Sequence, residues 1–170
     1  LQTNGTLLDE EWAAFLKEWP LERLRNMTLQ EYSAAGQASS FTYWIEKRLE
    51  DLGSIWGGSS FKFGVYSRAD KTNHEGGAGR LYTTDYGWMA KYGATAEEAF
   101  EKVRSLVVEV AEAAARANYG AIDAIDLGHA YKWKIAFHYQ DRSRPGVIGV
   151  LLKERLKKWV AARLEHPPSE

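Results

Sequence analysis

Hydrophobic residues recur at spacings of three and four along several stretches of the chain, which is typical of helices that bury one face. The clearest stretch spans about 96–116 and follows Thr95 and Glu98, which have the spacing of a capping box. Its expected buried stripe is Phe100, Val103, Val107, Val110 and Ala114. Further helices are predicted over 10–19 behind an N-cap at Asp9, over 29–32 behind Thr28, over 41–52 and over 152–164.

Elsewhere apolar and polar residues alternate, as they do in a strand with one buried face. This alternation predicts strands over 61–66, within 80–92, over 131–139 and over 147–151. The glycine-containing segment 69–79 is expected to be a mobile hairpin loop between the first two strands. We therefore predict an α+β fold, in which an antiparallel sheet of three to five strands is packed by the long helix, with flanking helices at both ends.

The composition is that of a globular protein rather than a disordered one. The chain has 170 residues, of which 45% are hydrophobic and 26% charged, so one domain is expected over 1–166 and the start of a linker over 167–170. The absence of Cys excludes disulfides, thiol nucleophiles and cysteine zinc sites, and it favours a cytoplasmic location. No run of about 18 apolar residues occurs, so no membrane span is expected. The scarcity of Met, Asn and Gln beside abundant Glu and Arg resembles the bias of thermophile proteins.

The sequence contains no P-loop, no serine-hydrolase elbow and no zinc-protease motif. We therefore expect a protein that is not an enzyme and needs no cofactor. One alternative is a divalent-metal site at Asp123, Asp126 and His129, which have the spacing of ligands on one helix face. The competing interpretation is that these three residues are helix caps and turn residues.

A glycine- and serine-rich segment surrounds one tryptophan. Gly or Ser occupies positions 53, 54 and 57–60 on the two sides of Trp56. Backbone amides near Gly57 and Ser59 can approach phosphate oxygens closely, and an exposed Trp56 can stack on a base. The alternative is a helix-to-strand turn whose tryptophan folds back into the core.

Aromatic and basic residues are interleaved on the predicted strands. Tyr66 and Tyr82 lie near Lys62, Arg68 and Arg80 in the expected sheet, a combination that suits stacking on bases with neutralisation of phosphates. The last third of the chain is basic, since nine Lys and Arg oppose two acidic residues over 131–163. Such an excess can supply several phosphate contacts. The alternatives are that the aromatic side chains form the core and that the lysines line a solvated helix face.

Four segments resemble the N-terminal region of McrB-like proteins, the nucleotide-hydrolysing subunits of modification-dependent restriction systems. They are Phe41-Thr42-Tyr43-Trp44, the run from Leu52 to Tyr66, Tyr86-Gly87-Trp88 and the run from Ile125 to Phe137. The resemblance covers roughly residues 27–160. It implies a DNA-recognition domain, which in some members flips a modified cytosine into an aromatic pocket, followed by an AAA+ GTPase motor. The Walker motif of that motor does not occur in this chain.

The resemblance thus implies a non-catalytic reader of modified duplex DNA for phage defence. The expected pocket lining is Trp56, Tyr66, Tyr82 and Trp88. The expected phosphate contacts are Lys62, Arg68, Arg80, Lys132, Lys134, Arg142 and Arg144. The competing hypothesis is a protein-interaction domain that docks a partner subunit through an aromatic surface, because Trp and Tyr are also favoured at protein interfaces.

Overall fold

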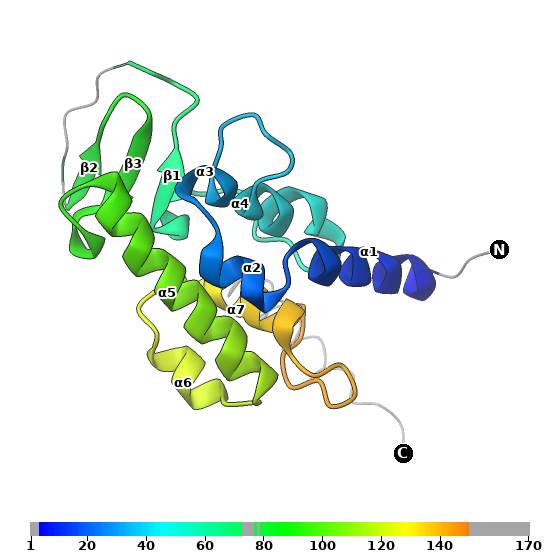
Figure 1. Ribbon diagram of the computed structural model, residues 1–170. Coiled ribbons are helices and arrows are strands. Elements are labelled where there is room, and N and C mark those ends of the chain that lie inside the picture. Colours follow the sequence, from blue (N-terminus) through cyan, green and yellow to red (C-terminus); the bar gives the residue numbers. More distant parts are fainter. Residues whose placement is uncertain (1–3, 73–76, 78, 150–170) are drawn as a thin grey trace, which may run out of the picture.

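A three-stranded antiparallel sheet lies at one end of the molecule, and helices build the rest (Figure 1). The computed structural model describes residues 4–72, 77 and 79–149. The α-helices are α1 (Asn4–Glu18), α2 (Leu21–Asn26), α3 (Leu29–Tyr32), α4 (Phe41–Tyr43), α5 (Ala96–Ala115), α6 (Tyr119–Ala124) and α7 (His129–Tyr139). A π-helical turn, η1 (Trp44–Arg48), and three 3₁₀ turns, η2 (Glu50–Leu52), η3 (Ser60–Phe63) and η4 (Ala90–Tyr92), complete the helical elements. The predicted α+β class is confirmed.

The strands β1 (Val65–Ser67), β2 (Arg80–Tyr82) and β3 (Tyr86–Met89) form a sheet in the order β1-β3-β2. Because side chains alternate between the faces of a strand, the register sorts them into two rows. One row is made of Val65, Trp88 and Leu81, and it lies on the core side of the sheet, against α5. Val65 and Trp88 are buried there. The row of Tyr66, Gly87 and Tyr82 lies on the opposite, outer face.

The connections differ from the predicted hairpin. Segment 69–79 joins β1 to β2, which are the two edge strands, whereas the hairpin links β2 to β3. The predicted strand over 61–66 is also shorter, because residues 60–63 form η3 and only β1 pairs with the sheet. Gly64 makes the transition with a φ of 81°, and a Cβ there would lie 2.6 Å from a methyl group of Val103. A glycine is therefore required at this position.

The strand predicted over 131–139 is wrong, since these residues belong to helix α7. This helix is buried on nearly all sides, and its buried residues are Tyr131, Lys132, Lys134, Ile135, Ala136 and His138. Polar side chains inside the protein produced the alternation that resembled a strand. Residues 147–149 form no strand either, and the remainder of the predicted strand and the predicted helix 152–164 lie outside the described residues.

The other helices follow the sequence more closely. All five residues predicted for the stripe of α5 are buried, and the Thr95 side chain accepts a hydrogen bond from the Glu98 amide, as a helix N-cap does. Thr28 caps α3 in a capping box with Glu31. Helix α1, however, begins at Asn4, so Asp9 lies inside it. The single helix predicted over 41–52 is divided into α4, η1 and η2.

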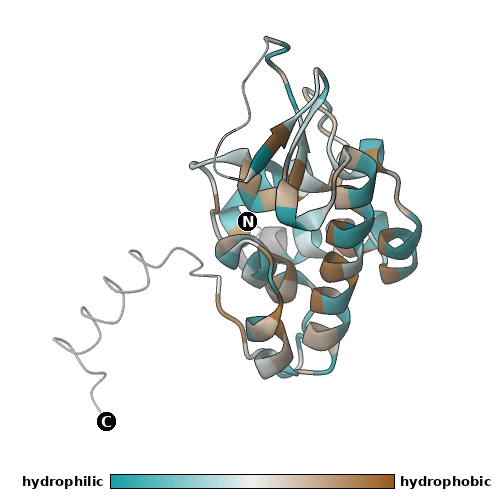
Figure 2. Ribbon diagram, turned by 90° about the vertical axis from the view of Figure 1, so that its left-hand side faces the viewer, coloured by the Kyte–Doolittle hydropathy of each residue, from teal (hydrophilic) through white to brown (hydrophobic). Residues whose placement is uncertain are grey.

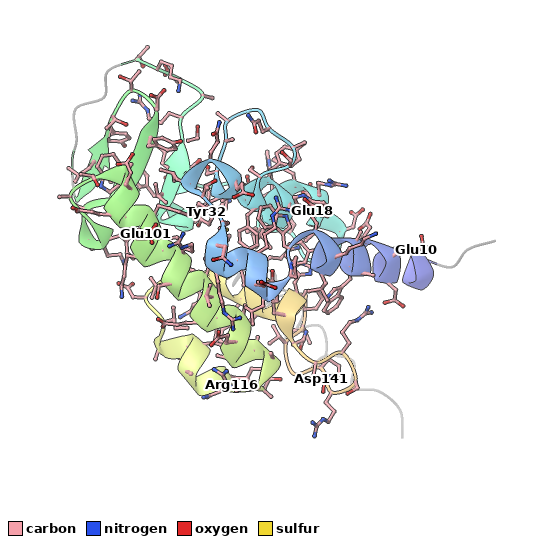
Figure 3. The ribbon with its side chains drawn as sticks, viewed as in Figure 1. Glu10, Glu18, Tyr32, Glu101, Arg116 and Asp141 are labelled. Carbon is pink, nitrogen blue, oxygen red and sulfur yellow. The ribbon has the colours of Figure 1, made fainter. Side chains whose placement is uncertain are left out.

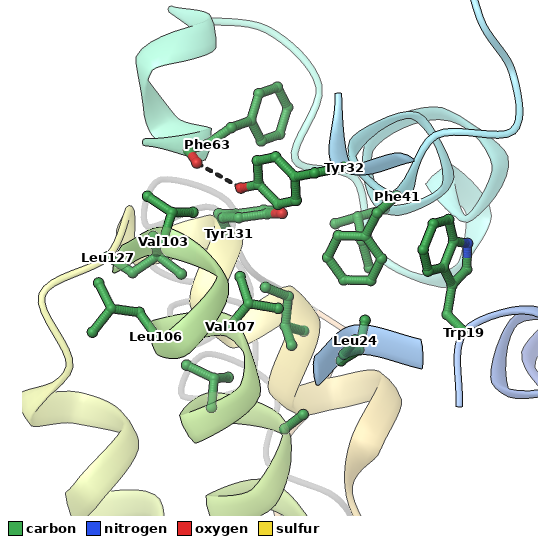
Figure 4. Packing of buried hydrophobic residues seen from close by; sticks show 14 of the residues in the cluster. Trp19, Leu24, Tyr32, Phe41, Phe63, Val103, Leu106, Val107, Leu127 and Tyr131 are labelled. Carbon is green, nitrogen blue, oxygen red and sulfur yellow. Dashed lines mark hydrogen bonds between the residues drawn. The ribbon is translucent and has the colours of Figure 1, made fainter. Parts of the chain in front are cut away.

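The core joins the sheet to the helices. Hydrophilic and hydrophobic residues are interleaved along the helical ribbons in Figure 2, as expected for elements that bury part of their surface. In the close-up, Tyr32 lies between Phe41 and Tyr131, and its hydroxyl donates to the Phe63 carbonyl at 2.6 Å (Figure 4). This bond ties α3 to η3 inside the protein. None of the helices within the described ranges has both the length and the apolar character needed to cross a bilayer.

Replacing Tyr32 with Phe tests this link between α3 and η3. The substitution removes the hydroxyl and leaves the buried Phe63 carbonyl without that donor, so the free energy of unfolding should fall by about 1–3 kcal/mol. Urea denaturation measures the change. Tyr43→Phe, at an exposed position, is the matched control and should leave the unfolding free energy nearly unchanged. Equal effects of the two substitutions would contradict this account.

Candidate nucleic-acid interface

Three aromatic rings gather on the outer face of the sheet. Phe61 meets Tyr66 and Tyr82 edge to face, at ring-centroid distances of 5.2 and 5.6 Å. The Tyr66 ring lies over Gly87, where a Cβ would approach it to 2.9 Å, so the missing side chain of this glycine makes room for the tyrosine. Both tyrosines are half-buried. The sheet thus presents an aromatic surface that is partly open to solvent.

Two arginines lie against these rings. The guanidinium carbon of Arg80 is 4.8 Å from the Phe61 ring centroid, and that of Arg68 is 5.4 Å from the Tyr82 ring centroid, both within cation–π range. Burial raises the pKa of the Tyr66 phenol, and the charges of Arg68 and Arg80 partly offset that rise. The structure therefore brings together four of the predicted site residues: Tyr66, Arg68, Arg80 and Tyr82. Phe61 completes the cluster and was not among the predicted site residues, because the 61–66 alternation placed it on the strand face opposite Tyr66, whereas it lies in η3.

The two arginines differ in accessibility. Arg80 is exposed, whereas Arg68 is buried and donates to the backbone carbonyls of Thr83, at 2.5 Å, and Thr72. Arg80 can therefore reach a ligand, while Arg68 shapes the site from behind.

A small pocket opens beside the tyrosines. It has a volume of about 160 Å³ and is lined by Tyr66, Arg68, Ala69, Asp70 and Tyr82. A wider groove of about 610 Å³ shares Arg68 and Ala69 with it and extends to the segment 34–37 after α3. Since typical ligand pockets measure about 300–1,000 Å³, the smaller pocket suits a single planar ring and the groove suits a longer ligand.

Trp56 is 60% exposed, so its side chain faces solvent rather than the core, as one of the two interpretations predicted. Its neighbour Ile55 is buried and anchors the loop of residues 53–59, which we call the Trp56 loop. Gly57 and Gly58 have φ values of 95° and 72°, and a Cβ on either would have no neighbouring atom within 4 Å, as expected for an open turn. The ammonium nitrogen of Lys47 lies 4.7 Å from the Trp56 ring centroid. Sequence reasoning missed Lys47, because the contact depends on how η1 is folded.

Lys62 lies beneath this loop rather than on a phosphate-accessible surface. Its ammonium donates to Glu46 Oε1 at 2.5 Å and to the carbonyls of Ile55 and Gly57 at 2.8 and 2.9 Å. An ammonium has three donors, so these acceptors use its full hydrogen-bonding capacity. The arrangement argues against the predicted phosphate contact. The Ser59 hydroxyl caps η3 by accepting from the Phe61 amide at 3.3 Å, while the phosphate contacts predicted for the backbone amides near Gly57 and Ser59 stay a prediction.

Lys132 and Lys134 are buried in α7, which corrects the prediction that they face phosphates. Lys132 donates to two carbonyls at the C-terminal end of α6, those of Asp123 at 2.6 Å and Ile125 at 2.9 Å. Lys134 donates to the carbonyls of Leu49 and Gly53, at the base of the Trp56 loop. Burial lowers the pKa of the Lys134 ammonium to about 7. Both lysines therefore hold the fold together from within.

The remaining predicted residues are dispersed. Trp88 is buried and donates its indole N–H to the Gly93 carbonyl at 3.0 Å, so it belongs to the core and not to a pocket. Arg142 pairs with Asp9, and Arg144 lies 3.8 Å from Asp141. Asp141 is at the end of the molecule opposite the sheet (Figure 3), so these arginines cannot share a small ligand with the aromatic cluster. The other cations of the basic last third lie outside the described residues.

The acidic residues suggested as metal ligands take other roles. The Asp126 carboxylate pairs with Lys91 at 2.6 Å, and the Asp123 carbonyl accepts from Lys132. Within residues 4–72, 77 and 79–149, no three His, Asp or Glu side chains are grouped so that they could hold a metal ion. In comparisons with known proteins, no family model, no curated protein and no solved structure matches this chain. The McrB-like resemblance therefore stays a prediction.

His138 provides a test of the buried polar groups in α7. Its ring packs between Trp12 and Phe15, at centroid distances of 5.5 and 5.1 Å, and neither ring nitrogen has a hydrogen-bond partner within the described part of the chain. Burial, and then the neighbouring Lys134 charge, lower the pKa of His138 well below 6.5. Below pH 6.5 the unfolded chain therefore takes up a proton that the folded protein excludes, and stability is lost as the pH falls.

The loss from this one group should approach about 1.4 kcal/mol per pH unit. His138→Phe fills nearly the same space without titrating, so its unfolding free energy should fall less between about pH 7.5 and pH 5, by on the order of 2 kcal/mol. Urea denaturation at the two pH values measures this, with His129→Phe at an exposed position of the same helix as the control. An unchanged pH dependence in His138→Phe would refute the assignment.

Proposed function

We propose that this domain binds DNA through the outer face of its sheet and the Trp56 loop, and that it reads a modified base. The observation that supports this most directly is the pocket between Tyr66 and Tyr82, with Arg68 behind it and Arg80 beside it. Aromatic faces that stack on bases, next to cations that neutralise phosphates, are the combination that single nucleotides and extruded bases require.

The pocket has the chemistry for one base. Extruding a base from a duplex costs a few kcal/mol, which stacking and hydrogen bonds in the pocket must offset. Tyr66 and Tyr82 supply aromatic surface. Asp70 also lines the pocket, and its carboxylate, whose Oδ1 accepts from the Thr72 amide at 2.9 Å, is an acceptor suited to the exocyclic amine of cytosine. A 5-methyl group adds about 1 kcal/mol through apolar contact, so discrimination by the methyl group alone is modest.

The cations available for phosphates are fewer than the sequence suggested. Arg80 is exposed beside the pocket, and Lys47 is exposed beside Trp56. The exposed indole of Trp56 can then stack on a base or fill the space that an extruded base leaves. The McrB-like resemblance extends this proposal to a cytoplasmic restriction complex for phage defence, in which the domain has no catalytic role and a GTPase motor belongs to the full-length protein.

Titration of duplex DNA tests the proposal. Labelled duplexes with and without one 5-methylcytosine, measured at about 50 and 200 mM salt, should bind in a salt-dependent way and favour the modified duplex. Tyr82→Ala should weaken binding by about 1–3 kcal/mol through lost stacking. Arg80→Gln should lower the salt slope by about 0.9, as expected for one lost phosphate contact.

Arg144→Gln is the matched control, because it removes an exposed arginine at the opposite end of the molecule. It should leave affinity and salt slope nearly unchanged. Absence of binding at low salt, or a salt slope near zero, would rule out the proposed function.

A second candidate is a docking surface for a partner protein. Within the described ranges, the exposed large hydrophobic side chains are Tyr43, Trp56 and Ile148, and exposed aromatic residues are favoured at protein interfaces. Arg80→Glu separates the two functions, since it should abolish DNA binding but leave docking through these side chains largely intact. Lys132 and Lys134 are unsuitable for this test, because a change of charge inside α7 would disturb folding.

A further inference from the structure

The Trp56 loop is restrained, although its sequence favours flexibility. Two glycines with positive φ follow the tryptophan, and glycine has more conformational freedom in the unfolded chain than any other residue. In the structure, however, the carbonyls of Ile55 and Gly57, one on each side of Trp56, bond to a single ammonium, that of Lys62. The backbone that carries the exposed indole is thereby fixed at two points.

Lys62 is held in turn by a π-helical turn. The Leu49 amide bonds to the Trp44 carbonyl at 3.1 Å, five residues earlier, which is the mark of the π turn η1. This turn directs Glu46 to Lys62, and the two side chains form an ion pair that is only partly exposed. It also directs Lys47 onto the Trp56 ring. Glu46 and Lys47, two successive residues of η1, therefore both restrain the loop. Glu46 holds Lys62, which bonds the loop backbone, and Lys47 contacts the Trp56 indole.

We propose that Glu46 and Lys62 are positioning residues, which hold Trp56 in its DNA-bound orientation before DNA arrives. This inference rests on the proposed DNA-binding function. A loop that is ordered in advance loses less conformational freedom on binding, and affinity rises accordingly. Lys62 acts on DNA only through Trp56, because its three donors are already bonded to Glu46, Ile55 and Gly57.

A double-mutant cycle distinguishes positioning from direct contact with DNA. The four proteins are the wild type, Lys62→Met, Trp56→Ala and the double variant, each titrated with the 5-methylcytosine duplex at two salt concentrations. Lys62→Met should weaken binding about tenfold when Trp56 is present and less than about twofold when it is absent, because coupled residues are not additive. The salt slope should stay the same in Lys62→Met, whereas loss of a phosphate contact would lower it by about 0.9.

Two control variants distinguish a general loss of stability from a loss of Trp56 positioning. Lys62→Arg retains the charge and the donors and should restore most of the affinity. Arg25→Met also removes a cation from an ion pair, that between Arg25 and Glu112 at 2.7 Å, and it should not change affinity. If Lys62→Met does not fold, Glu46→Gln enters the same cycle, since it weakens the restraint but leaves both carbonyl bonds of Lys62.

The outcomes separate this inference from the proposed function. Equal losses of affinity with and without Trp56, or a lower salt slope in Lys62→Met, would overturn the positioning role while the domain remains a DNA-binding protein. A wild-type protein that does not bind DNA would overturn both. If DNA binds but Trp56→Ala has no effect, the sheet-face site stands alone and the positioning role is refuted.

Discussion

Backbone carbonyls at the ends of short helical turns need donors, and this requirement governs the segment from α4 to η3. The segment folds into four short turns, each of which leaves carbonyls without partners inside the turn. Lys134 and Lys62 each bond two carbonyls of this segment. The Leu49 carbonyl is buried, and a buried carbonyl without a donor costs about 1–3 kcal/mol, so the geometry at the end of η1 depends on the Lys134 ammonium. The position of α7 is fixed by the same bonds, because that helix carries Lys134.

Cations that bond carbonyls inside the protein are not available at its surface. This lowers the number of phosphate contacts that the candidate interface can make. Lys132 and Lys134 are buried and Arg142 is paired with Asp9, so the predicted site cation that stays exposed beside the aromatic pocket is Arg80. Lys47 is exposed beside Trp56, and Lys71, which is paired with Asp85, lines the wider groove. Few phosphate contacts mean weak non-specific affinity and a small salt dependence. Binding by such a surface must then depend mainly on stacking, which favours ligands whose base is unpaired or easily extruded.

The sequence was a good guide where the local pattern and the tertiary environment agree. The stripe and cap of α5 could be predicted because most of its exposed residues are polar. Tyr66, Arg68, Arg80 and Tyr82 could be grouped because strand alternation places them on one face. Helix α7 could not, since burial on nearly all sides removes the periodic signal. The partners of Lys134 are carbonyls that lie 81 and 85 residues earlier in the chain, and such contacts leave no trace in local spacing.

The turn η3 joins the two parts of the candidate interface. Phe61 and Lys62 are consecutive, yet Phe61 packs into the aromatic cluster on the sheet while Lys62 holds the carbonyls of the Trp56 loop. Gly64 then directs the chain into β1 with a φ that only glycine adopts easily. The pocket and the loop are thus fixed relative to each other by one short turn. The tyrosines that line the pocket and the lysine that restrains Trp56 are therefore joined through one peptide unit, because Phe61 packs on those tyrosines and is followed directly by Lys62.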